Sequence, residues 1–384
     1  MAVTNLTEPI FQSETRNSTL ILSKFTPENI TKKNIGLAAE FSLPENDPVR
    51  IFGLPKKMLL EFRILSKPCS VVRGVTVETK ELLDNAKERS SLDMRVVLTG
   101  RSGCGKSYLL LQAVEYCKQN GWIVLYIPRA TNLVNSTTPY VYDLRTQIYS
   151  QPTFAYQTLQ RMLTVNRPTL DALELQTALV LEKQTVPAGT TLSALINIAL
   201  KDKSKASCMV ILETLLKELS EQTKYPVLVA VDEFQALYNK TMYRDPHFNT
   251  IAPYHLSMPR LLMEYASGRR SFAKGAFLGA VNDSDPMYPM PLELRDALQI
   301  EYMRPMSPYD KRSAGIAEYT KGLRALSVPE KLTLAEATSL FEIWMKDRAL
   351  ATVNPDTTFL SKYVESGGNP RDFVWKGILS TIEA

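Results

Sequence analysis

Histidine and cysteine are scarce in this sequence of 384 residues, which has two histidines and four cysteines. His247 and His255 lack the spaced cysteine or histidine partners that a zinc site needs. The cysteines lie far apart and form no C-x-x-C pair, which argues against a zinc knuckle and a disulfide framework and indicates a reducing compartment. They are Cys69, Cys104, Cys117 and Cys208.

Long apolar runs and strong charge are also lacking. No run approaches the ~18 to 20 residues that a membrane helix requires, so we expect no membrane insertion. The formal net charge of +5 fits contact with polyanions but is mild for a chain of this size. The first twenty residues contain Glu8 and Glu14 and a single arginine, which is atypical of an organelle transit peptide. The composition predicts a folded protein of two or three domains.

Hydropathy patterns divide the chain into three parts. Residues 1–75 mix prolines, charges and short apolar runs, which predicts an extended segment that wraps the core. Residues 76–305 alternate apolar strands with amphipathic helices and end in a short strand at about 297–303, which predicts an α/β core with a parallel sheet flanked by helices. A polar, tyrosine-rich insertion at 129–168 interrupts this rhythm. Residues 306–384 are predicted to form a helical lid domain.

A glycine-rich turn between an apolar strand and a helix matches the Walker A pattern of P-loop nucleotide-binding proteins. The glycines let successive backbone N–H groups point inward, and the helix N-terminus adds positive potential. Lys106 is expected to reach the β and γ phosphates and Ser107 to ligate Mg²⁺. The alternative is a glycine-rich turn that contains a lysine by chance. The predicted nucleotide-binding residues of this turn are Gly100, Arg101, Ser102, Gly103, Cys104, Gly105, Lys106 and Ser107.

A second acidic motif follows the apolar strand in "VLVAVDEF". The strand delivers Asp232 and Glu233 to its C-terminal end, the edge where open α/β sheets bind ligands. Asp232 is expected to hold Mg²⁺, directly or through water, and Glu233 to orient or deprotonate the attacking water. The alternative is an acidic strand end exposed to solvent.

Two further residues are weaker candidates. Asn282 follows the strand "FLGAV", where a polar side chain can sense the γ phosphate, but asparagine also commonly ends strands. Arg371 lies in the first turn of the last helix, after the cap Asn369, where it would serve either as a sensor arginine or as a charge on a solvated face. The guanine-reading N-K-x-D motif is missing, because "NKTM" at 239–242 lacks the aspartate. The residues alone therefore do not choose between ATP and GTP.

A basic cluster and a set of tyrosines remain open to two readings. Arg269, Arg270 and Lys274 lie close in sequence without an acid and could contact a phosphate backbone or end a solvated helix. Tyrosines of the insertion could be interface anchors or could pack within a loop. They are Tyr140, Tyr142, Tyr149 and Tyr156.

Four segments together resemble one family, the death-associated protein family of the mitochondrial small ribosomal subunit. They are "GRSGCGKSYLLLQAV", "YIPRATNLV", "VDEFQALY" and "GGNPRDF", of which the first two in combination are the most specific. The resemblance runs from about residue 35 to the C-terminus. By position, Gly100 to Ser107, Asp232 and Arg371 match the nucleotide motifs of that family.

This resemblance implies an AAA-like P-loop core with a helical lid, and bound GTP or GDP with Mg²⁺. It also implies a mitochondrial matrix location and contacts with small-subunit ribosomal proteins, rRNA and the large subunit. The first twenty residues do not have the composition of a mitochondrial transit peptide, so the expected location is supported by the resemblance alone.

Three functions compete on this basis. The first, which we favour, is a ribosomal component whose nucleotide is structural or slowly hydrolysed. The second is an AAA or signalling-type ATPase that remodels a partner, for which Arg145 or Arg161 could supply an arginine finger. The third, a nucleoside or sugar kinase, is disfavoured by the distant double-acid motif and the helical C-terminal part.

Overall fold

The computed structural model groups the chain into two compact units by their internal contacts. The sheet unit comprises Leu43–Pro55 and Val75–Glu330, and the terminal unit comprises Met1–Ser42, Lys56–Gly74 and Lys331–Ala384. In the described part of the chain, no helix is long and apolar enough to cross a membrane. The structure describes residues 20–181, 184–202, 204–301, 307, 309–347, 350 and 354–381.

The core of the sheet unit is a parallel sheet of five strands in the order β12-β4-β11-β10-β5. Every residue of β5, β10 and β11 is buried, which accounts for their continuous apolar sequences. β11, which confirms the strand predicted before Asn282, lies between β4 and β10. The strands are β4 (Arg95–Thr99), β5 (Ile123–Ile127), β10 (Val227–Asp232), β11 (Gly275–Ala280) and β12 (Arg324–Ser327).

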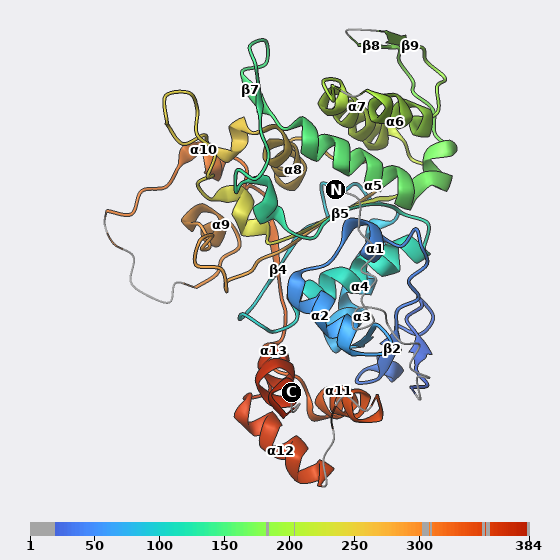
Figure 1. Ribbon diagram of the computed structural model, residues 1–384, viewed down its shortest axis with the longest axis vertical. Helices are drawn as coiled ribbons and strands as arrows, with labels where there is room; N and C mark the ends of the chain where they lie inside the picture. The colour runs from blue at the N-terminus through green and yellow to red at the C-terminus, as the bar shows by residue number, and fades with distance from the viewer. Residues whose placement is uncertain are drawn as a thin grey trace, which may run out of the picture. The chain divides into compact units, whose positions relative to one another are not determined.

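Helices flank this sheet and confirm the predicted α/β class. α4 packs against β4, β5, β10 and β11, and α5 packs against β5, with α6 and α7 lying against α5 (Figure 1). Nine consecutive residues of α4, 109–117, are buried together with Lys106, because the helix packs against four strands of the sheet. The helices are α1 (Pro48–Phe52), α3 (Gly74–Ala86), α4 (Lys106–Gln119), α5 (Pro152–Asp171), α6 (Leu192–Lys201), α7 (Cys208–Glu221), α8 (Ser257–Ser267), α9 (Leu292–Ala297) and α10 (Ala314–Ala317).

The predicted insertion is more regular than its sequence indicates. It begins with a 3₁₀ turn, η3 (Ala130–Leu133), continues through a hairpin of β6 (Val141–Asp143) and β7 (Ile148–Ser150), and then enters α5. The helix was not expected, because polar residues and Pro168 interrupt its apolar spacing. Shorter elements of the same unit are β8 (Leu179–Val180), β9 (Thr185–Val186), η4 (Phe234–Tyr238) and η5 (Pro253–His255).

The tyrosines of the insertion mostly serve local packing. The rings of Tyr140 and Tyr149 meet edge to face at 5.1 Å and pack on the buried cluster of Tyr243, Ile251 and Leu256. Tyr142 is 43% exposed. The ammonium group of Lys205 lies 5.0 Å from the ring of Tyr156.

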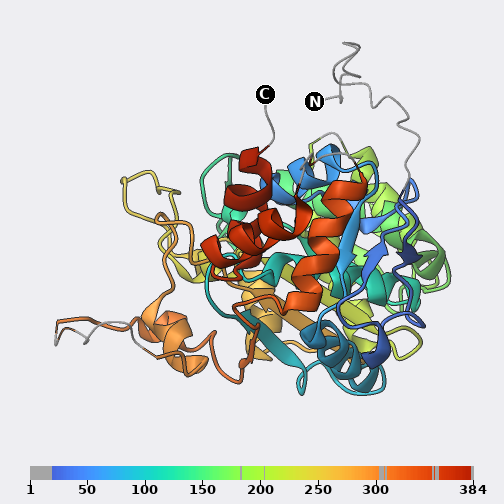
Figure 2. The same ribbon diagram turned by 90° about the horizontal axis from the view of Figure 1, so that it is seen from below.

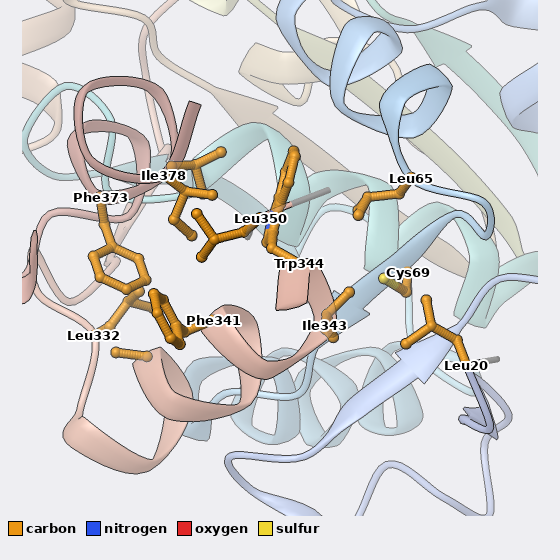
Figure 3. Close-up of a cluster of buried hydrophobic side chains, with 12 residues drawn as sticks. Leu20, Leu65, Cys69, Leu332, Phe341, Ile343, Trp344, Leu350, Phe373 and Ile378 are labelled. Carbon is orange, nitrogen blue, oxygen red and sulfur yellow. The ribbon is translucent and has the colours of Figure 1, made fainter. Parts of the chain in front are cut away.

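The terminal unit brings together residues from both ends of the chain. Its small sheet joins β1 in parallel and β3 in antiparallel fashion to β2. Leu20 and Cys69 lie in one buried cluster with Phe341, Trp344 and other side chains of the C-terminal helices (Figure 3). The elements are β1 (Ser23–Lys24), η2 (Lys32–Asn34), β2 (Ala38–Glu40), α2 (Lys56–Ile64), β3 (Cys69–Val71), α11 (Leu334–Lys346), α12 (Pro355–Glu365), α13 (Pro370–Asp372), the π-helix η6 (Phe373–Ile378) and η7 (Leu379–Thr381).

The two units differ from the three parts that the hydropathy patterns predict. The C-terminal helices form one bundle (red in Figure 2), as expected. They share their apolar core with segments of residues 1–75, which sequence alone treats as a separate extension. Of residues 307–330, those that the structure describes belong to the sheet unit, because β12 pairs with β4. Segment 1–75, predicted as an extended segment, also contains the short helices α1 and α2.

Candidate nucleotide-binding site

The loop between β4 and α4 requires glycine at three positions. Gly100, Gly103 and Gly105 have φ angles of 130°, 84° and 103°, a region that other residues rarely adopt. A Cβ atom at Gly100 would lie 2.8 Å from the carbonyl oxygen of Val328. The loop can therefore keep this backbone path only with glycine, and the path leads its N–H groups into the N-terminus of α4.

Lys106, the first residue of α4, is folded over the loop that precedes it. Its side chain is only 6% exposed, and Nζ donates to the carbonyl oxygens of Gly100 at 2.6 Å and Arg101 at 3.0 Å. Arg101 itself is exposed, whereas Cys104 is fully buried. The ammonium group is thus held inside the turn, where a lysine of this motif meets phosphate oxygens.

Asp232 ends β10 inside the protein, next to the start of α4. It is 1% exposed, and its Oδ1 accepts the Glu233 amide at 2.8 Å, while Oδ2 has no hydrogen-bond partner among the described residues. Burial raises the pKa of Asp232 to about 7, against the lowering effects of the Ser107 hydroxyl, the Glu233 amide and the Lys106 charge. The structure therefore brings Ser107, Lys106 and Asp232 together, as the sequence predicts.

These groups fit a hydrated Mg²⁺ ion bound to phosphate. A buried carboxylate oxygen without a donor is costly unless a cation or a proton satisfies it. The hydroxyl of Ser107 beside it is a second oxygen ligand of the kind that Mg²⁺ accepts. Within the described ranges, no three His, Cys, Asp or Glu side chains gather as a metal site, so phosphate and water would supply the other ligands.

Glu233 follows Asp232 in a left-handed conformation, with φ 56° and ψ 36°. Such angles are uncommon for a residue with a side chain and concentrate at functional sites. Its Oε2 accepts a hydrogen bond from the hydroxyl of Thr131, and its Oε1 lies 3.8 Å from Nε of Arg129. Sequence reasoning placed Glu233 but did not foresee these two partners, which come from the turn after β5.

Asn282 lies just beyond β11, and the buried Gln235 holds its backbone. The Gln235 side chain accepts from the Asn282 amide and donates to the Asn282 carbonyl, both at 2.8 Å. The side-chain oxygen of Asn282 accepts from the amide of Ser284 at 3.1 Å and from its hydroxyl at 2.5 Å. In this conformation the Asn282 side chain closes a turn with Ser284. A role of Asn282 as a phosphate sensor stays a prediction.

Arg371 belongs to the terminal unit. The predicted cap is confirmed, because the Asn369 side chain accepts from the amide of Asp372 at 3.2 Å. Nε of Arg371 lies 3.7 Å from the carboxylate of Asp372. Its contact with phosphates stays a prediction.

The basic cluster at 269–274 has acidic partners, of which Glu318 and Glu88 come from distant parts of the chain and Glu264 from the preceding helix α8. Arg269 pairs with Glu318 at 3.6 Å and stacks on Tyr319 at 4.2 Å. Ion pairs of 2.8 Å and 2.6 Å join Arg270 to Glu264 and Lys274 to Glu88. Each of the three basic side chains thus has an acidic partner outside the segment 269–274, and contact of the cluster with a phosphate backbone stays a prediction.

The chain matches a known protein family over most of its length. The family model described as mitochondrial ribosomal death-associated protein 3 matches residues 70–375, which include the Gly100–Ser107 loop and Asp232. The chain belongs to this family. The resemblance noted in the four sequence segments is thereby confirmed.

Individual relatives carry the name small ribosomal subunit protein mS29. That of Schizosaccharomyces pombe is 28% identical over 343 residues, covering 87% of this chain and 69% of the relative. That of Neurospora crassa is 26% identical over 381 residues, covering 94% and 79%. The mouse protein is 28% identical over 225 residues, covering 57% of each.

Among solved structures, the chain is similar to the Aeropyrum pernix ORC2 protein in its ADP form. The TM-score is 0.35 at 14% identity, over 85% of this chain and 64% of that chain. A similarity with this TM-score supports no conclusion about the ligand or the activity of the chain.

Proposed function

We propose that this chain binds a purine nucleotide, GTP or GDP, with Mg²⁺ in the Gly100–Ser107 loop, and holds it as part of the mitochondrial small ribosomal subunit. Its family is mitochondrial and ribosomal, and its relatives are named as small-subunit proteins. Partners within the small subunit follow from that membership. We further propose that the chain works in the matrix, contacts rRNA and reaches the large subunit across the subunit interface.

One observation carries the nucleotide proposal. The buried Oδ2 of Asp232 has no hydrogen-bond partner among the described residues, and it lies beside Ser107 and the buried Lys106. A Mg²⁺ ion would supply the positive charge that Oδ2 lacks. Lys106 and the N–H groups at the start of α4 would hold the phosphates, while Asp232 and Ser107 orient the cation.

A nucleotide bound in this way can act as a structural part. A ligand that binds only the folded state adds RT ln(1 + [L]/Kd) to the free energy of unfolding, about 4 kcal/mol at a thousandfold excess over Kd. The bound nucleotide would stabilise β4, α4 and β10 together, because the three elements supply its ligands.

The test is thermal unfolding of the purified chain with Mg²⁺ and GTP, GDP, ATP or ADP. We expect a purine nucleotide to raise Tm for the wild type and not for Lys106→Ala. Lys118→Ala is the control, because Lys118 lies on α4 too and its ammonium group bonds to the carbonyl of Val165. It should lower Tm but keep the nucleotide-induced rise. Equal rises in wild type and Lys106→Ala would contradict the site, and the nucleotide giving the largest rise identifies the base.

A second candidate is the AAA or signalling-type ATPase, which the position of Glu233 beside Asp232 favours. It requires nucleotide-dependent oligomers and turnover that a partner stimulates. Of the possible arginine fingers, Arg145 is exposed in the β6–β7 hairpin and Arg161 is half-buried on α5. Sedimentation that finds only monomers with ATP and Mg²⁺, together with no stimulated turnover, would remove this candidate.

A further inference from the structure

We infer that the amino end of the sheet, where its parallel strands begin, binds the phosphate backbone of RNA. This end lies opposite the nucleotide loop, because the loop follows the carboxyl end of β4 and all five strands are parallel. The inference rests on the proposed contact with rRNA and assigns that contact to one surface of the chain. It also gives a role to the basic cluster at 269–274.

Positive charge is concentrated in the connections that lead into the five strands. With the first residues of β4 and β12 included, these connections are 87–95, 120–122, 222–226, 268–274 and 318–324. They carry nine basic and three acidic residues, an excess of six positive charges, whereas the whole chain has a net charge of +5. The rest of the chain is therefore nearly neutral. The basic residues are Lys87, Arg89, Arg95, Lys224, Arg269, Arg270, Lys274, Lys321 and Arg324, and the acidic residues are Glu88, Asp93 and Glu318.

Arg95 draws two of these connections to the start of β4. Its Nη1 donates to the carbonyl oxygen of Lys321 at 3.0 Å, and its Nε donates to that of Leu92 at 2.9 Å. A Cβ atom would lie 2.6 Å from Nη1 at Gly268 and 2.3 Å from Nη2 at Gly322, so the guanidinium fills the space beside both glycines. The connections into β11 and β12 are thus held together, and so are the charged residues that follow each glycine.

Three guanidinium groups at this end are open to solvent, and two of them are held in position. Arg324 is exposed, and its Nη2 donates to the carbonyl oxygen of Asp93 at 2.8 Å. Arg269 is 44% exposed and lies 4.2 Å from the ring of the buried Tyr319. Arg89 is the third exposed guanidinium. A guanidinium that is already positioned loses less conformational entropy when it meets a phosphate.

The ion pairs at this end do not cancel its charge. Glu318 is shared by two cations, Arg269 at 3.6 Å and Lys321 at 2.6 Å, and its side chain is 50% exposed. Glu88, which pairs with Lys274 at 2.6 Å, is 69% exposed. Exposed ion pairs contribute little stability, because water and salt screen them. A phosphate group can therefore compete for these cations.

The composition of this end favours RNA over a protein or a membrane. Five of the nine basic residues are arginine, whose planar guanidinium forms paired hydrogen bonds with phosphate oxygens. Leu92, at 45%, is the one exposed large apolar side chain in the five connections, all of which the structure describes. Protein interfaces and membrane-binding faces use clustered apolar or aromatic side chains. Helical RNA is recognised largely by its shape and its backbone, which suits a charged surface of this kind.

The test is a fluorescence-anisotropy titration of the full chain with a labelled RNA hairpin of about 20 base pairs at several KCl concentrations. Each phosphate contact that is lost lowers the slope of log K against log[KCl] by about one. We expect Arg89→Gln combined with Arg324→Gln to lower the slope by about two and to weaken binding. The matched control is Arg145→Gln combined with Lys240→Gln, which removes the same charge from exposed side chains outside the five connections and should keep the wild-type slope.

Two further variants separate loss of charge from loss of folding. Arg89→Lys combined with Arg324→Lys keeps both charges and should keep the wild-type slope. Arg89→Gln alone changes one exposed side chain and should lower the slope by about one. An unchanged slope in Arg89→Gln and in the double glutamine variant would overturn the inference.

A polyglutamate peptide and vesicles of phosphatidylcholine and phosphatidylserine test the other possible partners. If either binds as tightly as the RNA hairpin at the same KCl concentration, RNA is overturned as the partner of this end of the sheet. If the wild type binds no RNA at any KCl concentration, the proposed rRNA contact and this inference both fall. If it binds RNA but the double glutamine variant behaves like the control, only the inference is overturned.

Discussion

The side-chain amide of Asn166 pairs with both backbone groups of Val124. Its oxygen accepts the Val124 amide at 2.8 Å, and its nitrogen donates to the Val124 carbonyl at 2.9 Å. Val124 lies on β5, an outer strand of the sheet, whose free edge would otherwise leave a buried donor and acceptor unpaired. α5 is kinked at Asn166, two positions before Pro168, and the kink brings the amide to this edge.

Removing this amide should destabilise the sheet unit. We expect Asn166→Ala to lower the free energy of unfolding by about 3 kcal/mol, because two buried backbone groups lose their partner. Thr164→Ala, an exposed change on the same helix, is the control and should cost less than about 0.5 kcal/mol. Urea unfolding of both variants checks this, and a loss below about 1 kcal/mol for Asn166→Ala would contradict the role assigned to it.

Glycine at position 100 should be essential for both the loop and the adjoining strand. In Gly100→Ala the new Cβ would meet the Val328 carbonyl at 2.8 Å, next to the point where the Val328 amide bonds to the Thr99 carbonyl at 2.8 Å. Gly121→Ala isolates the backbone cost, because Gly121 also has a positive φ, 74°, but nothing lies within 4 Å of its Cβ position. We expect Gly121→Ala to cost about 1 kcal/mol and Gly100→Ala clearly more, with loss of nucleotide binding. Equal Tm losses would show that the close approach to Val328 does not matter.

Mg²⁺ binding should depend on pH through Asp232. The pKa of Asp232 is raised to about 7, so below that pH a proton competes with the cation for the same carboxylate. Mg²⁺ affinity should therefore rise about tenfold per pH unit up to pH 7 and level off above it. In Asp232→Asn the Mg²⁺-dependent part of nucleotide binding should vanish at every pH. Calorimetric titrations between pH 6 and 8.5 would contradict this assignment if the wild-type affinity stayed constant.

Glu115 should limit stability at high pH. Burial and the neighbouring charge of Asp47 raise its pKa well above the usual 4.5, and its Oε1 has no hydrogen-bond partner in the described part of the chain. The folded state therefore holds a proton that the unfolded chain releases, and the free energy of unfolding falls as pH rises above 4.5. Asp47, whose pKa burial also raises, acts in the same direction, while Lys118 opposes it.

Glu115→Gln tests this directly. It should stabilise the protein by about 1 to 2 kcal/mol at pH 8 and change little at pH 4, because glutamine is neutral at both. Unfolding curves at the two pH values measure the difference. Equal effects at pH 4 and pH 8 would mean that ionisation of Glu115 is not involved.

The parts of the site that lie next to one another in sequence could be predicted. The apolar strand before Gly100, the loop itself and the start of α4 are one continuous segment, and the apolar run before Asp232 marks a buried strand in any parallel sheet. Local sequence therefore placed Lys106, Ser107 and Asp232 correctly. The pattern could not place Thr131 and Arg129 against Glu233, because that contact depends on how η3 packs against η4.

The edge strand β12 was not predicted, for a physical reason. β12 has mostly exposed side chains, so no apolar run marks it, and only its pairing with β4 defines it. The expected strand at 297–303 was wrong in its described portion, since α9 ends at Ala297 and residues 298–301 form no strand. Residues 302 and 303 lie outside the described residues. Apolar content identifies the buried strands, including the outer strand β5, whereas β12 is identified only by its pairing with β4.

The most direct test of the central claim is the nucleotide content of the particle that contains this chain. Small subunits that carry the tagged protein are purified from mitochondrial lysate through a high-salt sucrose gradient, which removes loosely held electrostatic partners, and are then denatured for chromatography of released nucleotide. We predict about one purine nucleotide per tagged chain in wild-type particles and a marked loss of it in Lys106→Ala particles. Intact wild-type particles without nucleotide, or sedimentation of the chain away from small-subunit rRNA, would contradict the account.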